Sequence, residues 1–419
     1  MAKTVKFISR RFGLYDPTQL ASYEAAGGFQ ALRRAVEMDG YDIAALLTAN
    51  GVQGRGGAAY DMGRKWSQAK DVKAEKKCVV CNADEGEPGT FKDRELLKND
   101  PFQLLEGMII AGWAVDACDG YLYLREEYSH LRPLLHSAIE QCRAAGYLGR
   151  SILGKKGFDF DIHLYSGAGA YVCGEGSALS ESIEGFAGRP RMKPPYIKQS
   201  GVYHLPTCMN NVESLSLVPP LLMDDAGFYR SQGTPECPGT KMISVSGNVC
   251  YPGVFEIPFG LTIREIIDLA GGVPDGRRIR LVQLGGASGR IASPAQLGTR
   301  YTYDDMRAAG LSAIGSGAVL VVDDRTGVIE FLRMTQEFFS HESCGQCTPC
   351  REGNHHIRLL LERVAAGEFT EHDVATMKKY AVIMSTASLC GLGESAQSAL
   401  LSAMEHFPEA FAVKKEAVR

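Results

Sequence analysis

The chain has 419 residues, of which 45% are hydrophobic and 22% are charged, and its formal net charge is −4. These values are typical of a globular protein with a hydrophobic core, and the length predicts about two to four domains. The small negative charge provides no broad basic field and therefore argues against nucleic-acid binding.

Neither a signal peptide nor a membrane span is expected. The N-terminal stretch Met1–Asp16 has no apolar core long enough for secretion. The most apolar region, Leu104–Leu124, is interrupted by Glu106, Asp116 and Asp119, so it cannot span a bilayer. We expect a cytoplasmic protein. It could also sit on the cytoplasmic face of a membrane complex, held there by a partner. The twelve cysteines are then expected to serve as metal or cluster ligands rather than disulfides.

Residues 1–50 are predicted as a lead-in that ends in a helix, because their apolar residues show helical spacing. The next stretch, Gly51–Tyr60, is rich in glycine, and its backbone N–H groups can cradle an anion. The glycines concerned are Gly54, Gly56 and Gly57. Arg55 and Lys65 add positive charge beside them. An ordinary turn would have the same composition, so this loop alone is not specific.

A short buried strand is predicted at Cys78–Cys81. Positions three apart on a strand face opposite sides, so these two cysteines are not expected to form a redox pair. The strand leads into an acidic stretch that contains Asn82, Asp84, Glu85 and Glu87. An acidic loop repels phosphate, so we expect it to bind hydroxyl or ring N–H groups of a ligand. A solvated acidic turn would look the same.

A second glycine-rich loop is preceded by further alternating strands and helices. Two helical patterns in residues 102–150 surround a strand at Gly120–Arg125, and Phe158–Tyr165 alternates as a further strand. It leads into Gly167–Gly176 and then into a helix at Ser177–Glu184. Strand, glycine loop and helix is the layout that places a phosphate at a helix N-terminus. The glycine spacing does not match the G-x-G-x-x-G fingerprint of dinucleotide-binding folds.

Two later segments are also candidates for ligand contact. Gly188–Tyr196 is basic and stiffened by proline, so it predicts either a phosphate contact for a second ligand or a surface loop. Asn210–Ser214 opens the next helix with an asparagine at a plausible cap position.

A domain boundary is predicted in the turn-rich residues 231–240. The next part has a capping box at Thr262 and Glu265 for a helix that stops at Gly271 and Gly272. Its strands are expected at Met242–Ser246, Ile279–Leu284 and Ala318–Val322. We interpret a β-β-α-β-β order as a small grasp-like domain. No catalytic constellation is apparent in it.

From residue 328 onward the pattern is helical. Four helices are predicted, at Val328–His341, Asn354–Ala366, Glu371–Met384 and Glu394–His406. The cysteines of this region fall at two turns between them. His355 and His356 lie near these cysteines and are expected to be ordinary helix-start residues.

Three cysteines, Cys344, Cys347 and Cys350, recur every third residue and are expected on a tight turn. A ferredoxin-type run would place a fourth cysteine at the position that Asn354 occupies here. The one cysteine further downstream is Cys390. Three close thiolates and one distant thiolate suit a [4Fe–4S] cluster. The alternative is a structural zinc site, although such sites more often use two separated pairs.

With these motifs in hand, the chain resembles the NADH-binding 51 kDa or F flavoprotein subunit of respiratory complex I over about residues 1–410. The family also supplies diaphorase subunits to soluble NAD-linked hydrogenases, formate dehydrogenases and electron-bifurcating complexes. The motifs that carry the resemblance are Gly54–Gly57, Asn82–Gly89, Gly167–Glu175, Lys193–Pro195, Asn210–Glu213 and Glu342–Gly353.

The resemblance implies an α/β plus α architecture in three domains. Residues 1–235 would form a Rossmann-like domain that binds FMN and the nicotinamide nucleotide. Residues 236–326 would form a ubiquitin-like (β-grasp) domain, and residues 327–419 a C-terminal four-helix bundle with one [4Fe–4S] cluster. The implied cofactors are FMN, the cluster and NAD(H), with NADP(H) as an alternative.

The resemblance also assigns site residues by motif. Those expected around FMN are Gly54, Gly56, Gly57, Lys65, Asn82, Asp84, Tyr171, Gly174, Glu175, Asn210 and Asn211. Those expected at the nucleotide are Tyr60, Glu87, Lys193 and Tyr196. Arg55, Glu85, Ser214 and Leu392 are counted as further cofactor-binding candidates. The expected cluster ligands are Cys344, Cys347, Cys350 and Cys390. Glu87 and Glu175 are the catalytic candidates, for tuning the flavin or releasing product.

The chain departs from the family pattern at three positions. A second glutamate usually follows Glu175, but Gly176 stands here, which leaves NADPH open beside NADH. Tyr60 and Gln68 stand where phenylalanines are usual. Tyrosine can still stack on adenine, whereas glutamine stacks less well.

The function that the resemblance implies is that of a diaphorase-type oxidoreductase subunit. A hydride would pass from nicotinamide to FMN, and single electrons would pass from FMN to the cluster. Expected partners are a thioredoxin-like [2Fe–2S] subunit and a larger iron–sulfur subunit. One alternative is an internal flavin and iron–sulfur conduit that binds no nicotinamide. Another is a non-enzymatic scaffold protein stabilised by a structural zinc site.

Overall fold

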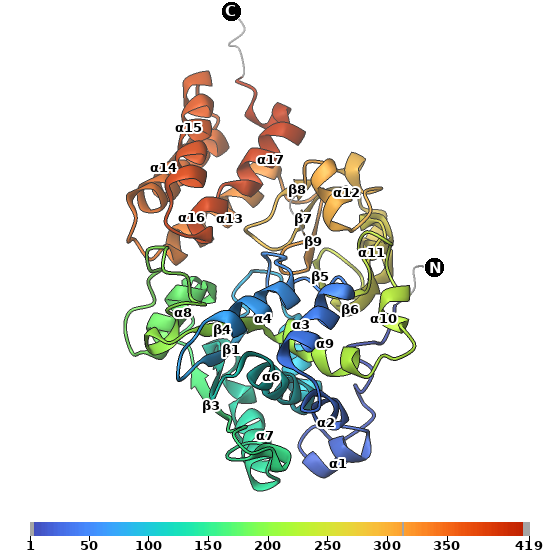
Figure 1. Ribbon diagram of the computed structural model, residues 1–419. Coiled ribbons are helices and arrows are strands. Elements are labelled where there is room, and N and C mark those ends of the chain that lie inside the picture. Colours follow the sequence, from blue (N-terminus) through green and yellow to red (C-terminus); the bar gives the residue numbers. More distant parts are fainter. Residues whose placement is uncertain (1–3, 312–313, 414–419) are drawn as a thin grey trace, which may run out of the picture.

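The computed structural model describes residues 4–311 and 314–413. Three regions follow one another along the chain (Figure 1). The first contains a four-stranded sheet, the second a five-stranded sheet, and the third is helical. In the view of Figure 1, the helical region lies at the upper left, above the first region and beside the second.

The first sheet is entirely parallel and has the order β3-β2-β1-β4. Its strands are β1 (Cys78–Ala83), β2 (Asp119–Leu124), β3 (Asp161–Ser166) and β4 (Thr207–Asn211). The first three confirm the predicted strands, whereas β4 was not predicted. Strand order reverses between β1 and β4, and in open α/β sheets ligands bind outside the carboxyl ends of the strands at such a point. The segments that follow β1 and β4 therefore mark the expected site.

Helices cover this sheet and connect its strands, as parallel pairing requires. They are α1 (Leu20–Ala25), α2 (Gln30–Ala35), α3 (Gly40–Ala49), α4 (Met62–Asp71), α5 (Lys92–Asn99), α6 (Pro101–Val115), α7 (Arg132–Ala144), α8 (Gly176–Ile183), α9 (Val212–Leu222) and α10 (Phe228–Ser231). Helix α6 is buried along nearly its whole length, which explains its apolar composition. Among the described residues, no helix combines the length and apolarity that crossing a bilayer requires.

The second sheet is mixed and has the order β6-β5-β9-β7-β8. Its strands are β5 (Thr240–Gly247), β6 (Gly253–Pro258), β7 (Ile279–Leu284), β8 (Ile291–Ala292) and β9 (Ala318–Asp323). Helix α11 (Ile263–Leu269) carries the predicted capping box of Thr262 and Glu265. The predicted β-β-α-β-β order was incomplete, because the short strand β8 and the helix α12 (Tyr303–Ala308) give a weak periodic signal.

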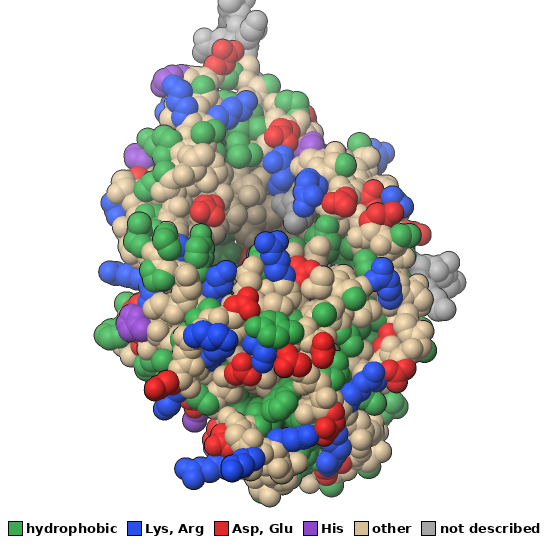
Figure 2. All heavy atoms as spheres, in the orientation of Figure 1, with side chains coloured by type: hydrophobic (Ala, Val, Ile, Leu, Met, Phe, Trp, Pro, Cys, Tyr) green, Lys and Arg blue, Asp and Glu red, His purple; other side chains and the backbone are tan. Residues whose placement is uncertain are grey.

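The helical region contains α13 (Val328–Glu342), α14 (Thr348–Ala366), α15 (Glu371–Ala387), α16 (Gly391–Ser395) and α17 (Ser398–His406). Helices α13 and α15 begin where predicted but end one and three residues later, and the other two predicted helices differ more. Helix α14 begins at Thr348 rather than Asn354, because Pro349 is tolerated in a first helical turn. The last predicted helix is divided into α16 and α17. Figure 2 shows charges of both signs interspersed over one face of the molecule.

A buried carboxylate joins the two sheet-containing regions. Glu213 in α9 accepts hydrogen bonds from the ammonium of Lys241 and from the backbone N–H of Met242 at 2.9 Å. Lys92 lies 3.0 Å away from the same carboxylate. All three charged side chains are buried. Burial alone would raise the pKa of Glu213, but Lys241, Lys92 and Arg55 outweigh burial and lower it to about 2.

Replacing Glu213 is therefore expected to destabilise the fold strongly. In Glu213→Gln the buried ammonium of Lys241 loses its countercharge, whereas Lys92 keeps its contact with Asp93 at 2.6 Å, so we expect a loss of about 3–5 kcal/mol in the free energy of unfolding. Urea denaturation measures it. The matched control is Asp225→Asn, which breaks an exposed ion pair with Arg34 and should cost less than about 1 kcal/mol. Equal losses in the two variants would contradict the expectation.

The same carboxylate predicts a pH dependence. Because the pKa of Glu213 is depressed from 4.5 to about 2 in the folded chain, its stabilisation is present above 4.5 and is lost as pH falls through 2. We expect the difference in unfolding free energy between wild type and Glu213→Gln to be larger at about pH 5 than at about pH 3. A difference that does not change over this range would show that Glu213 is not held ionised by the buried cations.

Candidate functional site

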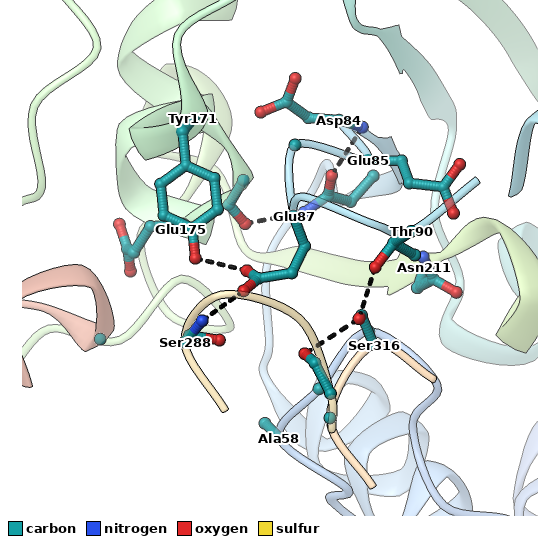
Figure 3. Close-up of a pocket in the computed structure, with 18 of the residues that line it drawn as sticks. Ala58, Asp84, Glu85, Glu87, Thr90, Tyr171, Glu175, Asn211, Ser288 and Ser316 are labelled. Carbon is teal, nitrogen blue, oxygen red and sulfur yellow. Dashed lines mark hydrogen bonds between the residues drawn. The ribbon is translucent and has the colours of Figure 1, made fainter. Parts of the chain in front are cut away.

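A cavity of about 640 Å³ lies where the three regions meet, at the carboxyl ends of β1 and β4 (Figure 3). Twelve of the predicted site residues line it: Arg55, Gly56, Gly57, Asn82, Asp84, Glu85, Glu87, Tyr171, Gly174, Glu175, Asn211 and Leu392. Its position agrees with the rule for ligand sites in open α/β sheets. Segments that are far apart in the sequence thus form one concave surface.

Four of the predicted residues lie in the protein around this cavity rather than on its wall. Gly54 pairs through its backbone N–H with the carbonyl of Tyr60 at 2.8 Å, and the ammonium of Lys65 donates to the carbonyl of Met209. The hydroxyl of Ser214 accepts the backbone N–H of Arg55 at 2.9 Å. The fourth, Asn210, is buried. These contacts hold the glycine loop and β4 next to each other.

Three predicted residues remain, Tyr60, Lys193 and Tyr196, and they lie at the surface and do not line the cavity. Lys193 contacts the carboxylate of Glu175 at 2.7 Å, and Glu175 itself lines the cavity. The rings of Tyr60 and Tyr196 are exposed. The amide of Gln68 donates to the hydroxyl of Tyr60 at 3.1 Å. The two departures from the family pattern at Tyr60 and Gln68 are therefore in contact.

The sequence did not predict the cavity residues that come from the five-stranded region. Gly285, Ser288, Gly289, Gly315 and Ser316 line the cavity opposite the parallel sheet. Thr90, Lys92 and Asp93, which follow the acidic stretch, were missed as well. The runs Gly-Gly-Ala-Ser-Gly at residues 285–289 and Gly-Ser-Gly at residues 315–317 are sequence signals that could have marked this wall, since such runs let a backbone approach a ligand closely.

The acidic stretch divides into a structural part and a free part. Glu85 accepts the backbone N–H groups of Asp93 and Arg94 at 2.9 and 3.1 Å, and so caps α5. Oδ2 of Asp84 is buried and has no hydrogen-bond partner among the described residues. Burial raises the pKa of Asp84 to about 7. An orphaned buried acceptor on the cavity wall suits a hydroxyl or N–H of a ligand, as predicted for this stretch.

Glu175 is held at the N-terminus of α8. One carboxylate oxygen accepts the backbone N–H groups of Ser177 and Ala178, both at 2.9 Å, and the other accepts from Lys193. Burial would raise the pKa of Glu175, but Lys193 and the hydrogen bonds of Ser177 and Ala178 lower it. Glu175 is thus a fixed negative charge on the cavity wall.

Arg55 does not supply charge to the glycine loop in the way the sequence indicated. Its guanidinium donates to the hydroxyl of Tyr229 at 2.8 Å and lies 4.9 Å from the ring centroid of Phe259. The side chain is therefore part of the junction with the five-stranded region. The cradle that remains is backbone, at Gly56 and Gly57, where φ of Gly57 is 126°.

The four predicted cysteines line one pocket of their own. Cys347 and Cys390 are the N-cap residues of α14 and α16. Cys350 lies in the first turn of α14, not on the predicted turn. Asn354 donates to its sulfur at 3.3 Å. Cys344 completes the set.

The thiols are spread around this pocket. Among residues 4–311 and 314–413, no three His, Cys, Asp or Glu side chains are gathered closely enough for a single metal ion. A cluster of several irons takes its ligands at separate corners, so spread thiols are compatible with one. His355 and His356 do not line the pocket and lie inside α14 rather than at its start.

The cavity and the cysteine pocket share part of their walls. Val172 and Leu392 line both of them. Beside them, the backbone N–H of Tyr171 donates to Glu342 at 3.0 Å, next to the first cysteine of the run. Two apolar side chains therefore separate the two candidate sites.

Three family models match the chain. Residues 47–220 match the Nuo51 FMN-binding domain, residues 242–292 match the SLBB domain, and residues 330–414 match the NADH-ubiquinone oxidoreductase-F iron-sulfur binding region. The first match contains the glycine loop and the acidic stretch, and the third contains all four cysteines.

Curated relatives match nearly the whole chain. The F 2 subunit of NADH-quinone oxidoreductase from Rhizobium meliloti (strain 1021) is 40% identical over 404 residues, which cover 96% of this chain and 96% of that protein. The HndC subunit of the NADP-reducing hydrogenase from Solidesulfovibrio fructosivorans is 38% identical over 406 residues, which cover 97% of this chain and 82% of that protein.

The crystal structure of an NAD+-reducing [NiFe]-hydrogenase in the H2-reduced state is also similar. Its TM-score is 0.82 at 37% identity, and the match covers 90% of this chain and 62% of the hydrogenase chain. The air-oxidized state gives a TM-score of 0.83 at 35% identity, covering 96% and 66%. This chain therefore spans less than two thirds of those hydrogenase chains.

Asp84 provides a test of the cavity as the flavin site. In Asp84→Ala the orphaned acceptor is lost, so at about pH 8, above the raised pKa of Asp84, we expect FMN to bind roughly ten- to one-hundred-fold more weakly, since a hydrogen bond to a charged group contributes about 1.5–3 kcal/mol. Quenching of FMN fluorescence on titration into flavin-free protein measures this. Asp116→Asn, outside the cavity and exposed, is the control. Unchanged FMN affinity in Asp84→Ala would exclude this contact.

Proposed function

The chain belongs to the family of the F subunits of NADH-quinone oxidoreductases, and from this membership we propose how its two candidate sites work together. It is the flavoprotein subunit of a multi-subunit oxidoreductase that connects a nicotinamide nucleotide with an iron–sulfur cluster through FMN. The observation that carries the proposal is the common wall of Val172 and Leu392 between the cavity and the cysteine pocket. Electron transfer requires such proximity.

FMN fits the cavity by the chemistry of its wall. The N–H cradle at Gly56 and Gly57 suits the phosphate, and the orphaned oxygen of Asp84 suits a hydroxyl. FMN, when bound, exchanges a hydride with the nicotinamide and single electrons with the cluster. Further FMN contacts in this proposal come from Asn82, Tyr171, Gly174, Glu175, Asn211 and Leu392, all on the same wall. Lys65 and Asn210 would support it from behind.

The nucleotide would enter beside FMN, near Tyr60, Glu87, Lys193 and Tyr196. The exposed rings of Tyr60 and Tyr196 are free to contact a base. No side chain needs to act as a general base, because the hydrogen leaves the nicotinamide together with its electron pair. The task of the chain is to hold two rings face to face and to exclude water. Glu87 and Glu175 contribute fixed polar groups at the cavity wall.

The four thiols of Cys344, Cys347, Cys350 and Cys390 would hold the [4Fe–4S] cluster. We place the domains at residues 1–235, 236–326 and 327–419. In this proposal the second is ubiquitin-like and the third is a four-helix bundle. The mixed five-stranded sheet with α11 supports the ubiquitin-like assignment. The successive long helices α13, α14 and α15 support the helix-bundle assignment.

Partner subunits follow from the family. Relatives named as subunits of NADH-quinone oxidoreductases and hydrogenases indicate that this chain works in an assembly. We propose a thioredoxin-like [2Fe–2S] subunit and a larger iron–sulfur subunit as neighbours. Copurification of native material under anaerobic conditions identifies them.

The choice between NADH and NADPH is a further part of the proposal. Gly176 stands where the family usually has a second glutamate, and HndC is named a subunit of an NADP-reducing hydrogenase. A Cβ at Gly176 would lie 3.1 Å from Ile197 and 3.3 Å from the sulfur of Met209, so a larger residue would need room. Both nucleotides are accordingly included in the test.

An anaerobic titration of the FMN-containing protein tests the function. We expect NADH, NADPH or both to bleach the flavin absorption. If neither nucleotide bleaches it in protein shown to contain FMN, the proposal fails and the internal electron conduit without a nicotinamide site is favoured instead.

The cysteine assignment predicts that the cluster can be lost while FMN stays bound. In Cys390→Ala we expect the iron content and the electron paramagnetic resonance signal of the reduced cluster to be lost, while FMN remains bound. Because hydride transfer needs only FMN, bleaching by nucleotide should persist. Cys250→Ala, which changes an exposed thiol outside the pocket, is the control. A full cluster signal in Cys390→Ala would refute the assignment.

A further inference from the structure

The loop Gly285–Gly289 joins β7 to β8 and reaches into the cavity from the five-stranded region. Its Ser288 donates a backbone hydrogen bond of 2.6 Å to Oε1 of Glu87, a residue 201 positions away in the sequence. Figure 3 shows Glu87 between Ser288 on one side and Tyr171 on the other. A loop of one region thus holds a cavity residue of another.

Glu87 connects this loop to the rest of the cavity. Its second carboxylate oxygen accepts the hydroxyl of Tyr171. The ring of Tyr171 in turn packs edge-on against Phe338 of α13, with centroids 5.1 Å apart. One carboxylate therefore links all three regions at the place where the nucleotide is proposed to bind.

Gly286 shows that the loop is shaped around the side chain of Glu87. Its φ is +96°, and a Cβ built there would lie 1.9 Å from Cγ of Glu87 and 2.6 Å from Cδ. Contacts this short cannot exist, so any larger residue would displace Glu87 or the loop. Glycine at this position is required by both the backbone and the neighbour.

A second contact fixes the same loop. The hydroxyl of Ser316 lies 2.6 Å from the hydroxyl of Thr90 and donates to the carbonyl of Gly285 at 3.0 Å. Thr90 follows Glu87 on the same segment, so the segment after β1 is held by hydrogen bonds at two points. Both hydrogen bonds come from the five-stranded region.

We propose that the five-stranded region is part of the nucleotide site, with Gly286 and Ser288 as positioning residues that set the carboxylate of Glu87. A carboxylate has about four acceptor positions, and the hydroxyl of Tyr171 and the backbone N–H and hydroxyl of Ser288 use three of them. The remaining position is left for a hydroxyl or N–H of the nucleotide. Affinity for the nucleotide then depends on a region that the cofactor motifs do not include. This inference rests on the proposed function.

The test compares two alanine variants in the complete protein with FMN and cluster. Gly286→Ala adds a methyl group against Glu87. Gly272→Ala is the matched control, because it lies in the same region at φ +70° with no atom within 4 Å of its Cβ. The probe is NAD+ or NADP+ added to the oxidised protein, with affinity measured by calorimetry, so that no turnover is needed.

We expect Gly286→Ala to weaken nucleotide binding by about ten-fold or more, with FMN and iron contents unchanged, and Gly272→Ala to bind as wild type. In steady state KM should rise more than kcat falls. A double variant adds a structural check: Gly286→Ala should lower the thermal midpoint less in a Glu87→Ala background, because Cγ is then absent.

If Gly286→Ala does not fold, Ser316→Ala takes its place. This variant removes the hydrogen bonds of the Ser316 hydroxyl to Thr90 and Gly285 without adding atoms. It should weaken nucleotide binding by a few-fold while FMN stays bound. Suppose that the wild-type protein binds nucleotide and that NADH or NADPH bleaches its flavin. If the variant that folds then binds nucleotide as tightly as wild type, the inference is overturned while the proposed function stands. If wild type neither binds NAD+ or NADP+ nor is bleached by NADH or NADPH, the proposed function falls and the inference falls with it.

Discussion

The carboxylate of Glu213 is the contact on which the arrangement of the molecule depends. It is buried between two lysines that belong to different regions, and it holds the parallel sheet against the five-stranded sheet. A buried charge is stable only while its partners stay in place, so this network allows one relative position of the two sheets. Lys92 belongs both to this network and to the cavity wall. The position of the sheets and the shape of the cavity are thus set by the same charges.

Around that junction the chain places two sites next to each other. The cavity uses the carboxyl ends of β1 and β4, and the cysteine pocket uses the N-termini of α14 and α16. Val172 and Leu392 are common to both. Polar groups that suit a flavin and soft ligands that suit iron are therefore separated by a thin apolar layer, which suits electron transfer and excludes water.

The structure gave several motif residues roles that residue type does not indicate. Arg55 was expected to attract an anion, but its guanidinium binds tyrosine hydroxyls at the region junction. Glu85 caps α5, whereas the neighbouring Asp84 keeps a free oxygen. Both carboxylates belong to one acidic motif. The difference arises from side-chain direction, which depends on what packs against each residue.

Local features could be predicted from the sequence because their causes are local. A short buried run marked β1, hydrophobic alternation marked β3, a capping box marked α11, and cysteine spacing together with one distant thiol marked the cysteine pocket. The contact between Ser288 and Glu87 could not be predicted in this way, because it joins segments 201 residues apart and uses a backbone N–H that every residue type except proline carries. Only tertiary packing decides which of these identical donors faces a given carboxylate. For this protein, sequence therefore determined the cofactor chemistry, and the packing of two sheets and a helical region decided which side chains surround it.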